Sequence, residues 1–117
     1  MMVTCWNNGA YHKSGAGYGL KIEHADKVCF QGMKNIVLTL EGISQPITVN
    51  IHKDSWERGC EELVKKEIGE WLISNGLAPW VKAKPPKLCL EPISGNMFRL
   101  HKSLSSPLQS DSIDYNI

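Results

Sequence analysis

The stretch from Asp54 to Trp80 most constrains the fold, because its apolar residues recur with the periodicity of an amphipathic helix. These apolar residues occupy one stripe of a helix with 3.6 residues per turn, and charged residues occupy the opposite side. The stripe consists of Trp56, Cys60, Leu63, Val64, Ile68, Trp71 and Leu72. We therefore expect one helical segment, set against a remainder that is mostly β.

Local signals predict where this helical segment begins and ends. Asp54 is suited to accept the free N–H groups of the first turn, and Glu57 follows three residues later, as in a capping box. The pair Asn75-Gly76 closes the segment, because glycine readily adopts the left-handed conformation that ends a helix. Gly59 and Gly69 each cost ~1 kcal/mol relative to alanine in a helix interior. A break into two shorter helices, between Gly59 and Glu61 or near Glu67, is therefore compatible with the pattern.

Two runs of strictly alternating apolar and polar residues predict a β-hairpin. They cover residues 36–40 and 47–51, and residues 41–46 form the connecting loop, in which Pro46 suits the start of a strand. Weaker extended signals predict further short strands at residues 3–6, 18–22 and 28–30, and a second hairpin formed by residues 88–90 and 97–100.

Together these elements predict an α+β fold. We expect an antiparallel sheet of about five strands in the order β-β-β-α-β-β, with the helical segment packed on one face. We expect residues 1–101 to form a single globular domain and the polar residues 102–117 to form a disordered tail. The uncovered sheet face is expected to include Val37, Cys89 and Met97. The predicted core consists of Ile36, Leu38, Leu40, Val49, Ile51, Trp56, Leu63, Ile68, Trp71, Leu90 and Phe98.

The composition argues against several functional classes. The net charge of +1 creates no strong field that would demand a polyanion or a membrane surface, and no apolar run approaches the length of a membrane span. The N-terminus lacks the layout of a signal peptide, so we expect a cytoplasmic protein. The four cysteines form no C-x-x-C pair, which predicts four reduced thiols and neither a metal site nor a cofactor.

A glycine-rich loop at residues 15–19 is the first candidate for chemistry, since backbone N–H groups in such loops can hold a phosphate. Phosphate-binding loops of this kind lead into a helix, whereas here a strand follows. We therefore interpret the glycines as residues of a tight hairpin that needs positive φ angles. The four histidines have no metal-ligand spacing.

The strongest candidate for binding is the basic extended stretch after the helical segment. Trp80 is followed by three lysines without an intervening acid, a pattern that suits base stacking and phosphate contacts, or a polyproline-like surface for a protein partner. Aromatic and basic residues of the glycine-rich region are added as candidates. The full set of candidate ligand- or partner-binding residues is Tyr11, His12, Tyr18, Trp80, Lys82, Lys84 and Lys87.

These features predict a small non-catalytic protein-interaction or accessory module that binds a protein partner or a second copy of itself. A weak nucleic-acid-binding protein, which uses Trp80 to Lys87, is the first alternative. The second alternative is a small hydrolase or nuclease that uses residues 12–26 and His52. No catalytic residue is assigned, because no assembled catalytic motif is recognisable in the sequence.

Overall fold

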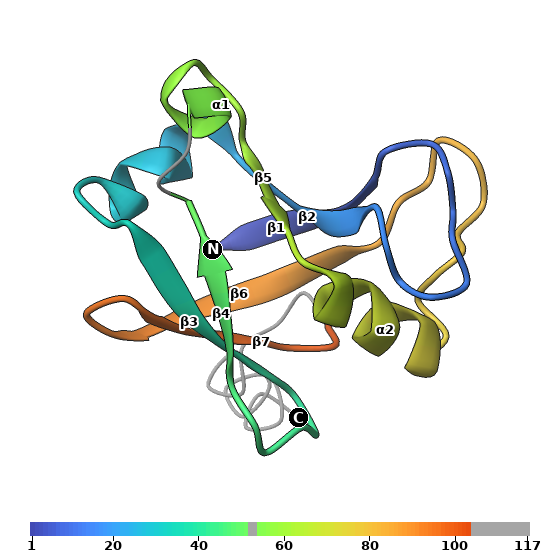
Figure 1. Cartoon of the computed structure of the whole chain (residues 1–117). Helices are drawn as coiled ribbons and strands as arrows, with labels where there is room; N and C mark the ends of the chain where they lie inside the picture. Colours follow the sequence, from blue (N-terminus) through green and yellow to red (C-terminus); the bar gives the residue numbers. More distant parts are fainter. Residues whose placement is uncertain (52–53, 104–117) are drawn as a thin grey trace, which may run out of the picture.

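The part of the chain that the structure describes folds into a strongly curved mixed sheet with two short α-helices and one 3₁₀ helix (Figure 1). The computed structural model describes residues 1–51 and 54–103, so the predicted tail lies outside the described residues apart from Lys102 and Ser103. In chain order the elements are β1 (Met2–Asn7), β2 (Tyr18–Ile22), η1 (His24–Phe30), β3 (Asn35–Leu40), β4 (Ile47–Asn50), α1 (Asp54–Glu57), β5 (Glu62–Val64), α2 (Lys66–Ser74), β6 (Lys87–Ser94) and β7 (Met97–Leu100).

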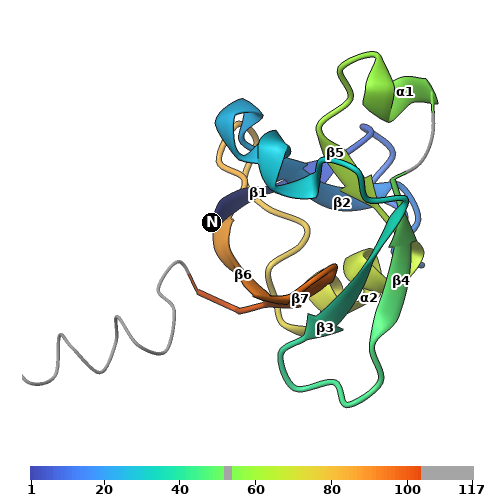
Figure 2. The same cartoon turned by 90° about the vertical axis from the view of Figure 1, so that its left-hand side faces the viewer.

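The sheet curls until it is nearly a barrel. Its seven strands follow the order β4-β3-β7-β6-β1-β2-β5, and the two outer strands, β4 and β5, approach each other. Figure 2 looks into this curl, with α2 behind its opening. Neighbouring strands are antiparallel except β3 and β7, which run parallel. The predicted α+β class is therefore confirmed, with seven strands in place of about five and with one parallel pair.

The expected single helical segment is divided by a strand. Gly59 has a φ of 115°, which is incompatible with a right-handed helix, and the chain turns there from α1 towards β5. In β5, Leu63 lies opposite Leu20 of β2 and is fully buried, while Val64 is partly exposed. The predicted end at Asn75-Gly76 is confirmed, because α2 stops at Ser74 and Gly76 has a φ of 71°.

The predicted core is confirmed, since every residue proposed for it is buried. Two other predictions are wrong. Cys89, expected on an exposed sheet face, is 8% exposed, although it is not part of the enclosed core. The chain after β7 returns to β6 at this position, where the N–H of Cys89 donates to the carbonyl of Ser103 at 2.8 Å and the N–H of His101 donates to the carbonyl of Cys89 at 2.9 Å. Residues 28–30, expected to be extended, belong to η1, whose Phe30 stacks on Phe98 with ring centroids 4.9 Å apart. No helix within the described residues has the length and apolar character needed to cross a bilayer.

Two glycines bring the β1–β2 loop against α2. A Cβ atom at Gly15 would lie 2.6 Å from the backbone nitrogen of Glu70 and 2.7 Å from the carbonyl oxygen of Lys66. A Cβ atom at Gly69, in the middle of α2, would overlap the backbone of Gly15. Gly69 therefore has a packing role that explains a residue otherwise unfavourable inside a helix.

Replacing Gly69 with alanine is expected to lower the free energy of unfolding by ~1–3 kcal/mol, because overpacking against backbone outweighs the better helix propensity of alanine. Urea denaturation measures this change. Lys66→Ala, at an exposed position of the same helix, is the control and should change stability little. An increase in stability for Gly69→Ala would contradict the close approach of the loop.

The four cysteine thiols are free and differ in their surroundings. Cys5 in β1 is 2% exposed, and burial raises its pKa to about 12, against a smaller opposing effect of a backbone hydrogen bond. Cys29 in η1 is exposed, Cys60 is half-buried and Cys89 is buried. Since the thiolate is the reactive form, Cys5 is inert at neutral pH, as a structural residue of the core should be.

Iodoacetamide at mildly alkaline pH is therefore expected to alkylate Cys29 at least ~100-fold faster than Cys5 in the folded protein. Peptide mapping by mass spectrometry gives both rates, and the urea-unfolded protein should show similar rates at the two positions. Equal rates in the folded protein would show that β1 is not buried as described.

Candidate functional site

Three aromatic residues from two distant segments meet at one end of the barrel. Tyr11 lies in the β1–β2 loop, Tyr18 starts β2, and Trp80 lies in the segment between α2 and β6 (Figure 1). Their rings pack edge to face in all three pairs, with centroids 6.1 Å apart for Tyr11–Tyr18, 6.0 Å for Tyr11–Trp80 and 5.7 Å for Tyr18–Trp80. This geometry is favourable for aromatic pairs, so the three rings support each other's orientation.

Two of these rings, Tyr11 and Trp80, line a shallow hollow of about 330 Å³ together with Pro79 and Lys82. We call these four residues together with Tyr18 the aromatic corner. Tyr18 is 1% exposed and packs against the rings of Tyr11 and Trp80 without lining the hollow itself. Burial raises the pKa of its hydroxyl, with a smaller contribution from Tyr11. Tyr11 is 45% exposed and Trp80 is half-buried, so both present ring surface to a ligand.

Local hydrogen bonds hold Tyr11 in place. The side-chain oxygen of Asn7 accepts the backbone N–H groups of Gly9, at 2.6 Å, and of Tyr11, at 3.3 Å. Tyr11 has a φ of 50°, which is uncommon for a bulky residue and requires such support. The side-chain nitrogen of Asn7 is buried and makes no hydrogen bond within the part of the chain that the structure describes.

The segment that carries Trp80 also contains a non-glycine residue with a positive φ angle. Ala83 has a φ of 66°, and the N–H of Lys84 donates to the carbonyl of Val81 at 2.9 Å, which makes a tight turn directly after Trp80. Tyr11 and Ala83 are the non-glycine residues with positive φ in the described chain, and they lie on the two segments that form the aromatic corner. Backbone strain of this kind concentrates at functional sites.

The structure thus brings together four of the seven candidates from the sequence: Tyr11, Tyr18, Trp80 and Lys82. His12, Lys84 and Lys87 are exposed but do not line the hollow. Pro79 also lines the hollow but was not among the candidates. Its position directly before Trp80 in the sequence could have suggested it.

His24, within the segment 12–26 considered for a hydrolase or nuclease, and Lys27, directly after it, both make contacts with the α1–β5 region. Lys27 donates to the carbonyls of Trp56 at 2.6 Å and Cys60 at 2.7 Å, and it lies 4.6 Å from the centre of the Trp56 ring. His24 bonds Glu61 at 2.7 Å. His52 lies outside the described residues, and among those described no group of three or more His, Cys, Asp or Glu is arranged to hold a metal ion.

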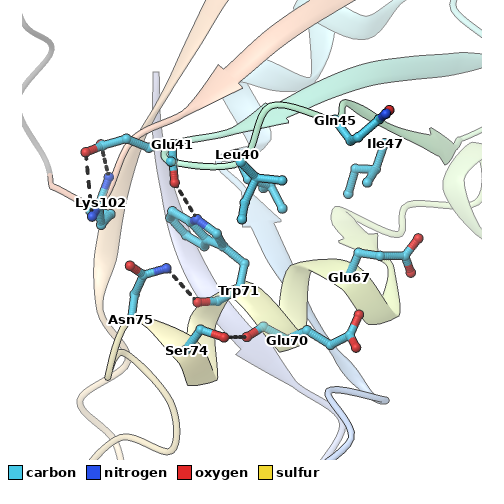
Figure 3. Close-up of a pocket in the computed structure, with 12 residues that line it drawn as sticks. Leu40, Glu41, Gln45, Ile47, Glu67, Glu70, Trp71, Ser74, Asn75 and Lys102 are labelled. Carbon is cyan, nitrogen blue, oxygen red and sulfur yellow. Dashed lines mark hydrogen bonds and ion pairs between the residues drawn. The ribbon is translucent and has the colours of Figure 1, made fainter.

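A second hollow, which the sequence did not indicate, lies between α2 and the β3–β4 loop (Figure 3). Its volume is about 600 Å³, and Trp71 lies at its centre with its indole N–H donating to the carbonyl of Glu41 at 2.8 Å. Behind Glu41, the buried His101 contacts two carboxylates, Glu91 at 2.8 Å and Glu41 at 3.8 Å. These contacts tie β6, β7 and the end of β3 together.

Comparison with known proteins adds no assignment: no protein-family model, no curated protein and no solved structure matches the chain.

A double-mutant cycle tests whether the aromatic corner is assembled as described. Tyr11→Ala and Trp80→Ala should couple by ~0.5–1.5 kcal/mol in the free energy of unfolding, the value typical of an aromatic pair. Urea denaturation of both single variants and the double variant measures the coupling. A cycle of Tyr11→Ala with Trp6→Ala serves as the control, and purely additive effects in the first cycle would contradict the contact.

Proposed function

We propose that the protein is a small cytoplasmic binding module without catalysis of its own, which takes an extended, proline-containing segment of a partner protein at the aromatic corner. The observation that carries the proposal is the convergence of Tyr11, Pro79 and Trp80 around one hollow. Grooves lined by aromatic side chains recognise polyproline-type segments, whose extended conformation is already formed before binding.

The rigidity of the aromatic corner supports this function. Tyr11 and Trp80 are each held by ring contacts and by a local turn, so little side-chain entropy is lost when a ligand binds. Tyrosine and tryptophan on the rim of a pocket are also the residue types that most often dominate binding energy.

Lys82 favours a partner segment that carries a negative charge. It lines the hollow and is exposed, so an acidic residue beside the prolines of the partner would meet its ammonium group. Such a contact contributes to specificity and to the rate of association more than to affinity.

A nucleic acid is the second candidate ligand, because Lys82, Lys84 and Lys87 are all exposed on the segment that carries Trp80. A base stacked on Trp80 with phosphates near these lysines would use the same surface. Two of the three lysines lie outside the hollow, which favours the peptide.

Selection from a displayed library of random peptides tests the proposal. Peptides with closely spaced prolines and an acidic residue should be enriched on the wild-type protein, and Trp80→Ala should weaken the binding of an enriched peptide at least ~10-fold. Lys82→Glu should weaken acidic peptides selectively. Trp6→Ala is the matched control, because Trp6 is also half-buried but does not line the hollow.

Binding of the enriched peptides to Trp80→Ala with unchanged affinity would contradict the proposal. A single-stranded oligothymidylate that shifts the Trp80 indole signal in NMR spectra and is displaced by salt, when no peptide does so, would favour the nucleic acid.

A further inference from the structure

The hollow at Trp71 has the size and composition of a ligand site. Its volume of about 600 Å³ lies within the ~300–1,000 Å³ that is typical of small-molecule pockets. It shares no lining residue with the aromatic corner. Ile43 and Ile47 supply the exposed apolar surface of this hollow, and the nearly buried Leu40 and Trp71 form its floor, so a ligand would need an apolar body to fill it.

The polar groups in this hollow are mostly already engaged. The indole N–H of Trp71 donates to Glu41, the side-chain nitrogen of Asn75 donates to the carbonyl of Trp71 at 2.8 Å, and the hydroxyl of Ser74 donates to the carbonyl of Glu70 at 2.8 Å. Because these donors already have acceptors within the protein, a ligand does not need to supply hydrogen-bond acceptors for them.

The carboxylates of Glu67 and Glu70 are different. Both line the hollow from α2, three residues apart and therefore on one side of the helix, and within the described residues neither carboxylate makes an ion pair. Glu41 already has Lys102 beside it, through the backbone N–H at 2.9 Å and the ammonium at 4.0 Å. Figure 3 shows Glu67 and Glu70 at one end of the hollow and Glu41 with Lys102 at the other.

We propose that this hollow binds a small organic cation, a molecule with an apolar body and one protonated amine. The apolar body lies against Ile43 and Ile47 above the floor formed by Trp71, and the ammonium group lies between Glu67 and Glu70. Three carboxylates against one lysine make the lining complementary to a cation, and the apolar surface between them excludes a fully hydrated metal ion as the natural occupant.

The test uses three probes of similar shape: 4-phenylbutylamine, 4-phenylbutanol and 4-phenylbutyrate. The indole N–H signal of Trp71 reports occupancy in NMR titrations, because its hydrogen bond to Glu41 lies beside the bound ligand. The amine should shift this signal at millimolar concentration, bind ~3- to 10-fold more tightly than the alcohol, and bind more weakly as salt is added. The carboxylate should bind most weakly.

The double variant Glu67→Gln/Glu70→Gln should lose the preference for the amine over the alcohol and keep the binding of the alcohol. Glu57→Gln, which removes an exposed carboxylate of α1 outside the hollow, is the control and should keep the preference. No shift of the Trp71 indole with the amine, or equal affinity for amine and alcohol in the wild-type protein, would overturn the proposal. Neither result depends on the aromatic corner.

Discussion

The close approach of Gly15 to Gly69 is the contact on which both surfaces of this protein depend. It lets the β1–β2 loop lie directly on the backbone of α2, which no residue with a side chain would permit at either position. The loop thereby brings Tyr11 to Trp80, which follows α2 in the chain. The other side of α2 carries Trp71, whose indole N–H donates to the carbonyl of Glu41. One short helix therefore positions two hollows at once.

The curl of the sheet explains why so short a helix suffices. With β4 and β5 approaching each other, the strands enclose most of the apolar residues themselves, and α2 has only to close one end. The β3–β4 loop and α2 together line the hollow at Trp71, and the bond from the Trp71 indole N–H to the carbonyl of Glu41 joins them. Leu100 of β7 lies opposite both Leu40 of β3 and Leu90 of β6, and the following residue, His101, contacts Glu41 and Glu91. The packing of α2 against the curled sheet thus both closes the core and forms the hollow at Trp71.

Both predicted hairpins and the strand part of the core followed from local alternation, because buried positions repeat with the period of the strand. The core residues Ile68 and Trp71 of α2 followed from the helical period of 3.6 residues. Strand β5 could not be predicted from the sequence, because Leu63 fits a helical stripe as well as a strand. Its pairing partner Leu20 is also remote in the sequence. Tyr11 and Trp80 could be nominated separately as aromatic residues in irregular segments. Their contact, like the hollow at Trp71, depends on how distant segments pack, and periodicity carries no information on that.

The most direct test of this account is a set of nuclear Overhauser effects in isotopically labelled protein. The account predicts strong effects between the α-protons of Gly15 and Gly69, together with effects between the ring protons of Tyr11 and Trp80. Amide signals of residues 62–64 should show the cross-strand pattern of β5 with β2. A continuous helical pattern of effects from 54 to 74, without a signal between Gly15 and Gly69, would contradict the fold and both sites built on it.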